Sequence, residues 1–253
     1  MKARIISLVN HKGGVGKTTS AVNIGAGLNR LGKKVLLVDL DSQANLTDHL
    51  GIDTELDETI YGAMKGHHPL PVVTVKDGLD VVPSTLDLAA AEIELSTKIG
   101  RENILRKLLA PVAGRYDFVL IDCPPSLGLL TVNSLAASDM AIIVAEPGKF
   151  STMGMKRLIE IFETVREAIN NNLKDYKILV TKYDSRKSLP KQFTEFVQET
   201  YRGKVYQTAI RATVALGDAQ MQGKCIFDTD VKSRGAEDYL ALSREIIDDK
   251  WKF

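Results

Sequence analysis

A glycine-rich segment with two lysines, residues 10–19 (NHKGGVGKTT), constrains the fold of this chain more than any other feature. It lies between a short apolar run at 5–9 and a stretch with helical periodicity at 18–31. Glycines allow successive backbone N–H groups to face one anion, and the N-terminal end of the following helix adds positive partial charge. The segment therefore predicts a phosphate-binding P-loop between a strand and a helix.

The side chains of this loop predict nucleotide chemistry. Lys17 would reach the β- and γ-phosphates, and Thr18 would place its hydroxyl on Mg²⁺. His11 stands where the usual pattern has glycine, and Lys12 adds a second cation beside Gly13. Because one lysine suffices for one nucleotide, Lys12 is either a solvated loop charge or a residue with a second role. The spacing around it favours the second role.

Apolar runs alternate with helical patterns along the rest of the chain. We expect strands at 34–40, 78–83, 116–122, 140–145 and 177–181, with a weaker one at 205–210. We expect helices at 86–98, 102–109, 129–137, 152–170, 191–201 and 236–248. This alternation predicts an α/β fold with a mainly parallel, twisted sheet and helices on both faces. No repeat or linker interrupts the pattern, so we expect a single P-loop NTPase domain over 1–253.

Composition excludes several other classes of protein. Hydrophobic residues make up 44% of the 253, which is typical of a globular chain. The net charge of +1 gives no support for a strongly basic protein, so any nucleic-acid binding would need a local patch. Cys123 and Cys225 lack the spacing of a metal or redox site, and no apolar run approaches the ~18 residues of a membrane span. We therefore expect a cytoplasmic protein.

Carboxylates end two of the expected strands. Asp39 and Asp41 close the run at 34–40, and Asp122 closes the run at 116–122. Ligands of open parallel sheets bind outside the carboxyl ends of the strands, which is where these side chains fall. Mg²⁺ and an attacking water both need oxygen ligands near a γ-phosphate. Together with the loop, the three carboxylates predict a site for a nucleotide and Mg²⁺.

Four segments resemble the ParA/MinD family of deviant Walker ATPases, most closely its ParA (Soj-like) partition branch. The family's loop signature KGGxGK[ST] appears at 12–18, and its second motif resembles 38–45. Its Walker B region resembles 121–126, and the segment at 232–237 is similar to one of the partition branch. The resemblance covers essentially the whole chain. It leads us to expect no N-terminal helix-turn-helix domain.

The resemblance also implies roles for individual residues. Lys12 is the signature lysine, which reaches the nucleotide held by the other subunit of an ATP-sandwich homodimer. Gly13 lies where the two loops approach closely. Asp41 holds the attacking water and is a further candidate to hold Mg²⁺ through water, while Asp122 holds Mg²⁺ through water and Asp39 supports them. The resemblance thus makes Lys12, Lys17 and Asp41 catalytic, and the loop's remaining nucleotide contacts are Gly14, Val15, Gly16, Thr18 and Thr19.

The function implied is that of a partition ATPase. Such a protein hydrolyses ATP slowly alone, binds double-stranded DNA without sequence preference as the ATP dimer, and is released when a ParB-like partner stimulates hydrolysis. It would associate with the nucleoid to segregate plasmid or chromosomal DNA. Basic residues of the C-terminal half are candidates for DNA contacts, with a solvated mixed-charge surface as the alternative: Lys204, Arg211, Lys224, Lys232 and Arg234.

The chain departs from the family pattern in two segments, and other functions stay open. Residues 210–214 (IRATV) replace the usual Pro-Arg-Asn, and 145–151 differs from the usual Glu-Tyr-Tyr run. A MinD-like role on a membrane or a protein assembly is the alternative, although acidic residues near Trp251 and Phe253 oppose membrane binding. An electron-transfer ATPase would need paired cysteines. A small-molecule ligase would need an acceptor pocket that no motif indicates.

Overall fold

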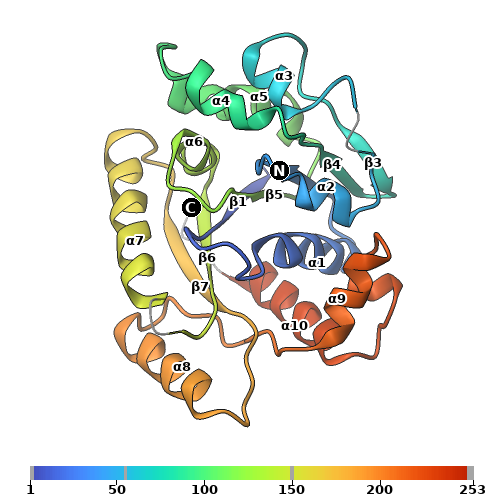
Figure 1. The fold of residues 1–253 in the computed structure, drawn as a ribbon, viewed down its shortest axis with the longest axis vertical. Coiled ribbons are helices and arrows are strands. Elements are labelled where there is room, and N and C mark those ends of the chain that lie inside the picture. Colours follow the sequence, from blue (N-terminus) through green and yellow to red (C-terminus); the bar gives the residue numbers. More distant parts are fainter. Residues whose placement is uncertain (1–2, 54–55, 149–150, 250–253) are drawn as a thin grey trace.

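The structure, a computed structural model, describes residues 3–53, 56–148 and 151–249 (Figure 1). Its centre is a seven-stranded sheet in the order β3-β4-β2-β5-β1-β6-β7. All neighbouring strands pair in parallel except β3 and β4, which form an antiparallel hairpin. The strands are β1 (Arg4–Val9), β2 (Val35–Asp39), β3 (Val73–Lys76), β4 (Leu79–Val82), β5 (Phe118–Asp122), β6 (Met140–Ala145) and β7 (Asp175–Val180).

Helices cover both faces of this sheet, as the alternating pattern predicts (Figure 1). One core lies beneath α3 (Ile60–Lys65), α4 (Leu88–Glu94), α5 (Ile104–Ala113), α6 (Leu129–Ala137), α7 (Ser151–Ala168) and α8 (Ser188–Thr200). The other lies beneath α1 (Lys17–Arg30), α2 (Asn45–His49), α9 (Val214–Met221) and α10 (Arg234–Asp248). Two short 3₁₀ turns, Arg101–Asn103 and Ile226–Asp228, complete the described elements.

The central strands are buried on both faces, which explains their continuous apolar runs. Every residue of β2 and of β5 is buried, and their side chains alternate between the two cores. The parallel register places Asp39 directly beside Asp122. The carboxyl ends of β1, β2 and β5 therefore meet at one edge of the sheet, where the glycine-rich loop follows β1.

The structure differs from the expected elements in several places. The weak run at 205–210 is not a strand, because it meets the edge of β7 through an isolated bridge between Ile178 and Val205. The pattern analysis missed β3, α2, α3 and α9, each eight residues or shorter. Helix α5 continues past the expected end at 109 and includes Pro111. Within the described ranges, no helix combines the length and the apolar character needed to cross a membrane.

Candidate functional site

The loop between β1 and α1 takes a conformation that only glycine adopts readily at two positions. Gly14 and Gly16 have φ of 74° and 91°, in the left-handed region. Gly16 immediately precedes the first residue of α1, Lys17. The loop therefore curls around the N-terminal end of α1, which is the geometry of an anion site.

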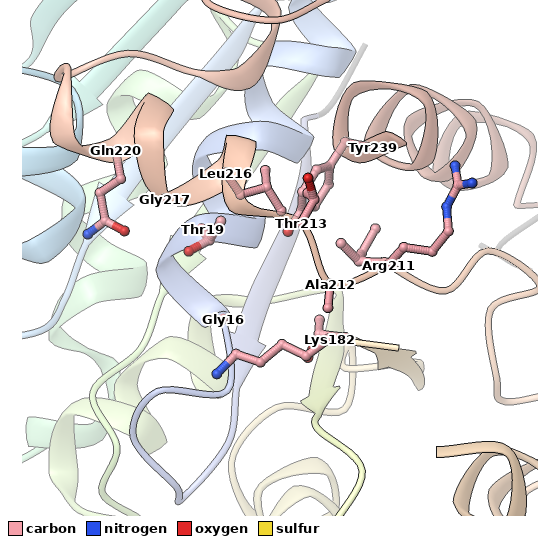
Figure 2. Close-up of a pocket in the computed structure, with 12 residues that line it drawn as sticks. Gly16, Thr19, Lys182, Arg211, Ala212, Thr213, Leu216, Gly217, Gln220 and Tyr239 are labelled. Carbon is pink, nitrogen blue, oxygen red and sulfur yellow. The ribbon is translucent and has the colours of Figure 1, made fainter. Parts of the chain in front are cut away.

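Two adjoining cavities open at this loop. The first, of about 500 Å³, is lined by residues of the loop, the β2 end and neighbouring segments: Gly13, Gly14, Gly16, Lys17, Thr18, Thr19, Asp41, Gln43, Asn45, Pro125, Lys182 and Gln220. The second, of about 280 Å³, shares Gly16, Thr19, Lys182 and Gln220 with the first (Figure 2). Its lining includes apolar groups of Ile210, Ala212, Leu216 and Tyr239. A polar cavity beside a more apolar one matches the two halves of a nucleotide.

Lys17 lies inside the polar cavity. Its side chain is buried, with 6% of its surface exposed, and its Nζ donates to the carbonyl oxygen of Lys12 at 3.4 Å. A buried ammonium whose hydrogen-bond partner is a single loop carbonyl is ready to exchange that contact for an anion. The P-loop pattern predicts that this ammonium contacts the phosphates.

Thr18, which lines the polar cavity, is hydrogen-bonded to the fully buried Asp122. The Thr18 hydroxyl donates to Asp122 Oδ2 at 2.6 Å, and Asp122 Oδ1 is buried without a hydrogen-bond partner among the described residues. Burial, together with the nearby charge of Asp39, raises the pKa of Asp122 to about 8. Such an oxygen fits a cation, which would restore the ionised form.

Magnesium would not be held by carboxylates alone. No group of three His, Cys, Asp or Glu side chains within the described ranges is close enough to form a metal cage. Mg²⁺ commonly uses one or two carboxylates together with waters and substrate phosphates. Thr18 and Asp122 supply that kind of partial oxygen set, so these residues fit Mg²⁺ bound with a nucleotide.

Asp39 and Asp41 take different positions, although they are two residues apart. Asp39 is fully buried and accepts hydrogen bonds from the backbone N–H of Asp41 and from both N–H and hydroxyl of Thr47. Burial raises the pKa of Asp39 to about 6. Asp41 instead lines the polar cavity and accepts from the backbone N–H of Gln43. Asp39 thus anchors the loop after β2, while Asp41 faces the ligand space.

Lys12 is exposed and lines neither of the two cavities. Its side chain is 55% exposed, it lines neither cavity, and its Nζ lies 3.5 Å from Glu146 Oε2. A Cβ added at Gly13 would meet no described atom within 4 Å. The single chain therefore supplies no packing reason for glycine at this position and no phosphate contact for Lys12.

The pattern analysis missed several residues around the site. Thr181 and Lys182 follow β7 and contact the loop, and Glu146 follows β6 and contacts Lys12 and Lys182. Gln43 and Gln220 line the polar cavity. The available signal was position, because Glu146 directly follows the carboxyl end of β6 and Lys182 lies two residues after that of β7.

Two segments, 210–214 and 145–151, differ from the family pattern, and the structure places only part of them at the site. Ile210, Arg211, Ala212 and Thr213 line the second cavity, in place of the usual Pro-Arg-Asn (Figure 2). In the other segment, 149–150 lie outside the described residues, as do 250–253 with Trp251 and Phe253.

The five basic residues considered for DNA contacts divide into two groups. Lys204 pairs with Asp175, and Arg211 makes a two-pronged ion pair with Asp238 and a further one with Glu237. The other three are exposed and belong to no ion pair of the described ranges: Lys224, Lys232 and Arg234. They lie on the segment from the end of α9 to the start of α10.

Comparison with known proteins identifies the family. Residues 3–175 match the family model described as an AAA domain. The chain is 42% identical over 247 residues to the sporulation initiation inhibitor protein Soj of Bacillus subtilis, covering 96% of this chain and 98% of Soj. It is 41% identical over 248 residues to the chromosome partitioning protein ParA of Myxococcus xanthus, covering 96% and 88%.

A solved structure is also similar over nearly the full length. It is described as cobyrinic acid a,c-diamide synthase from Mycobacterium smegmatis with bound ADP and magnesium. The two share 32% sequence identity with a TM-score of 0.86, over 97% of this chain and 94% of the other. The motifs, the fold and these relatives agree: the chain belongs to the ParA/MinD family of P-loop ATPases, together with the Soj and ParA chromosome-partitioning proteins.

Proposed function

We propose that this protein is a Mg²⁺-dependent partition ATPase that works as an ATP-sandwich homodimer. Lys17 and the loop amides hold the phosphates, while Thr18 and Asp122 hold Mg²⁺, the latter through water. When bound, Mg²⁺ neutralises charge on the β- and γ-phosphates. Asp41 orients the attacking water. The Soj and ParA relatives and the Mg-ADP complex of a similar structure support the nucleotide and the metal.

The position of Lys12 outside both cavities carries the proposal of a dimer. Its ammonium lines neither cavity of its own chain, and it lies on the rim of the loop beside Gly13. A cation so placed reaches a phosphate only when a second nucleotide site faces it. In the dimer Lys12 would neutralise charge on the partner's transferring phosphoryl group, as an arginine finger does in other P-loop enzymes. The open space around Gly13 would then admit the partner's loop.

The proposed cargo is DNA, bound without sequence preference and released by a ParB-like partner that stimulates hydrolysis. The exposed Lys224, Lys232 and Arg234 are the first candidates for phosphate contacts. Each chain has a net charge of only +1, so one patch alone would bind a polyanion weakly. The ATP dimer would bring two patches together and so supply enough local positive charge for DNA binding. The protein would then be cytoplasmic and associated with the nucleoid.

The test measures binding to a random-sequence duplex by the Asp41→Ala protein, which is expected to retain ATP. Binding is compared with Mg-ATP, Mg-ADP and no nucleotide, over a salt series. We expect binding with Mg-ATP alone, and a slope of log K against log salt of about −0.9 for each phosphate contact. Lys12→Ala in the same background is the matched control, and it should bind no DNA in any nucleotide state.

Other outcomes separate the alternatives. Mg-ATP dimers that ignore DNA but sediment with anionic vesicles would favour a MinD-like role on a membrane. A protein that hydrolyses ATP as a monomer at the full rate would favour a small-molecule ligase. A lack of affinity for both ATP and ADP would remove the proposal altogether.

A further inference from the structure

Two consecutive residues after β7 hold two consecutive carbonyl groups of the glycine-rich loop. The Thr181 hydroxyl donates to the carbonyl oxygen of Val15 at 2.7 Å. Lys182 Nζ donates to the carbonyl oxygen of Gly14 at 2.6 Å. These contacts join segments 166 and 168 residues apart in the sequence.

The backbone of Lys182 takes an unusual conformation to make its contact. Its φ is 51°, in the left-handed region, and the only other described non-glycine residue with a positive φ is Ala44. Side chains resist this region, so a lysine persists there only where the surrounding structure requires it. Figure 2 shows the Lys182 side chain extending beneath Gly16 towards the loop.

The contacts determine which way the loop's amides point. In a planar peptide the carbonyl oxygen and the next residue's N–H point in opposite directions. A donor that holds the Gly14 carbonyl therefore also sets the direction of the Val15 N–H. In the same way, the Thr181 contact with the Val15 carbonyl sets the Gly16 N–H. An anion site of this kind requires those N–H groups to converge before the ligand arrives.

We propose that Thr181 and Lys182 are positioning residues that preset the amides of Val15 and Gly16 for a bound polyphosphate. They act through the loop and not by contact with the base. This inference rests on the proposed nucleotide site. It assigns Lys182 a role separate from that of Lys17, which lines the polar cavity, and of Lys12, which lines neither cavity.

Lys182 has a second neighbour that limits how the test is designed. Its Nζ lies 3.6 Å from Glu146 Oε1, and its side chain is 49% exposed. It also lines both cavities. A direct contact with the nucleoside would therefore be the competing explanation for any loss of affinity. Inorganic tripolyphosphate separates the two, because it occupies the phosphate half and carries no base or ribose.

The experiment measures the dissociation constants of Mg-ADP and of Mg-tripolyphosphate by calorimetry. Lys182→Met retains the alkyl stem and removes the ammonium, while Thr181→Val retains the shape and removes the hydroxyl. For each variant we expect both constants to rise by about tenfold, and by the same factor for the two ligands. The double variant should lose less than the product of the two factors, because both residues hold one loop.

Two further variants control for charge and for folding. Lys187→Met removes a charge from an exposed position in the same segment and should leave both constants unchanged. Lys182→Gly suits the left-handed backbone, so it should fold at least as stably as the parent and still lose affinity for both ligands.

The results have distinct meanings. Unchanged constants in Lys182→Met and Lys182→Gly would overturn the inference. Weaker Mg-ADP binding with unchanged tripolyphosphate binding would also overturn it, because Lys182 would then contact the nucleoside. If the parent protein binds neither ligand, the proposed function itself fails.

Discussion

At the scale of single residues, three carboxylates lie close together in a buried part of the site. Asp39 and Asp122 are fully buried side by side, and Asp41 is 7% exposed at the cavity wall. Burial raises the pKa of Asp39 and of Asp122, and the neighbouring carboxylates add to the effect. The buried carboxylates therefore destabilise the folded protein, and a bound cation would remove this destabilisation.

Replacing Asp122 by Asn tests this cost. Removal of the charge should raise the midpoint of thermal unfolding without nucleotide by about 2–4 °C, which corresponds to about 1 kcal/mol in a chain of this size. In the parent protein with ADP, Mg²⁺ should raise the midpoint of thermal unfolding further. In Asp122→Asn this additional rise should disappear. Differential scanning fluorimetry with ADP, with and without Mg²⁺, measures both effects. A lower midpoint without ligands would show that the carboxylate stabilises the fold.

Asp41 should matter for hydrolysis and not for folding. Asp41→Ala should slow ATP hydrolysis by at least about 100-fold, the usual contribution of a residue that positions or activates water. Its affinity for ATP should stay within a few-fold of the parent, because Lys17 and the loop amides remain. Single-turnover hydrolysis and equilibrium binding measure these separately. Hydrolysis at the parental rate would remove Asp41 from the mechanism.

At the scale of elements, the contact between α1 and α10 holds the loop's helix in place. A Cβ added at Gly27 of α1 would lie 2.3 Å from Ser243 Oγ of α10, so the two helices approach more closely than any side chain permits. The Ser243 hydroxyl in turn donates to the Tyr239 carbonyl within α10. This close approach fixes the position of α1, and hence of the phosphate site at its N-terminal end.

Gly27→Ala should destabilise the protein by about 1–3 kcal/mol, the usual cost of overpacking. Gly217→Ala on α9 is the matched control, since a Cβ there would meet nothing within 4 Å and alanine is the better helix former. It should stabilise by up to about 1 kcal/mol. Adding Ser243→Ala to Gly27→Ala should recover part of the loss. Urea unfolding measures all three, and equal effects of the two glycine substitutions would contradict the packing argument.

At the scale of the whole molecule, the position of Lys12 predicts separate control of binding and dimerisation. Lys12→Ala should bind Mg-ADP within about threefold of the parent, because its ammonium lines neither cavity. It should fail to form the ATP dimer. Gly13→Val should fail in the same way, although a Cβ there would meet no described atom of its own chain within 4 Å. Light scattering after size exclusion, in the Asp41→Ala background, measures dimer formation by both variants. A dimer formed by Lys12→Ala would contradict the proposal that Lys12 contacts the partner's nucleotide.

Much of the fold was predictable, because its determinants are local in sequence. The buried runs of β1, β2, β4, β5, β6 and β7 are almost continuously apolar, and each corresponds to an expected strand. The hairpin strand β3 was missed because its four residues carry little pattern. The run at 205–210 has the composition of a strand, but its backbone makes only scattered contacts with the edge of β7.

The sequence by itself indicated the loop, its lysines and the carboxylates, because each belongs to a short local motif whose residue types and spacing are typical of a nucleotide site. Only the tertiary structure decided that Lys12 lines neither cavity, that Glu146 lies beside it, and that Thr181 and Lys182 hold the loop's carbonyls. The physical reason is chain separation. Hydrogen bonds between segments more than 130 residues apart depend on how parallel strands are ordered in the sheet, and no local pattern encodes that order.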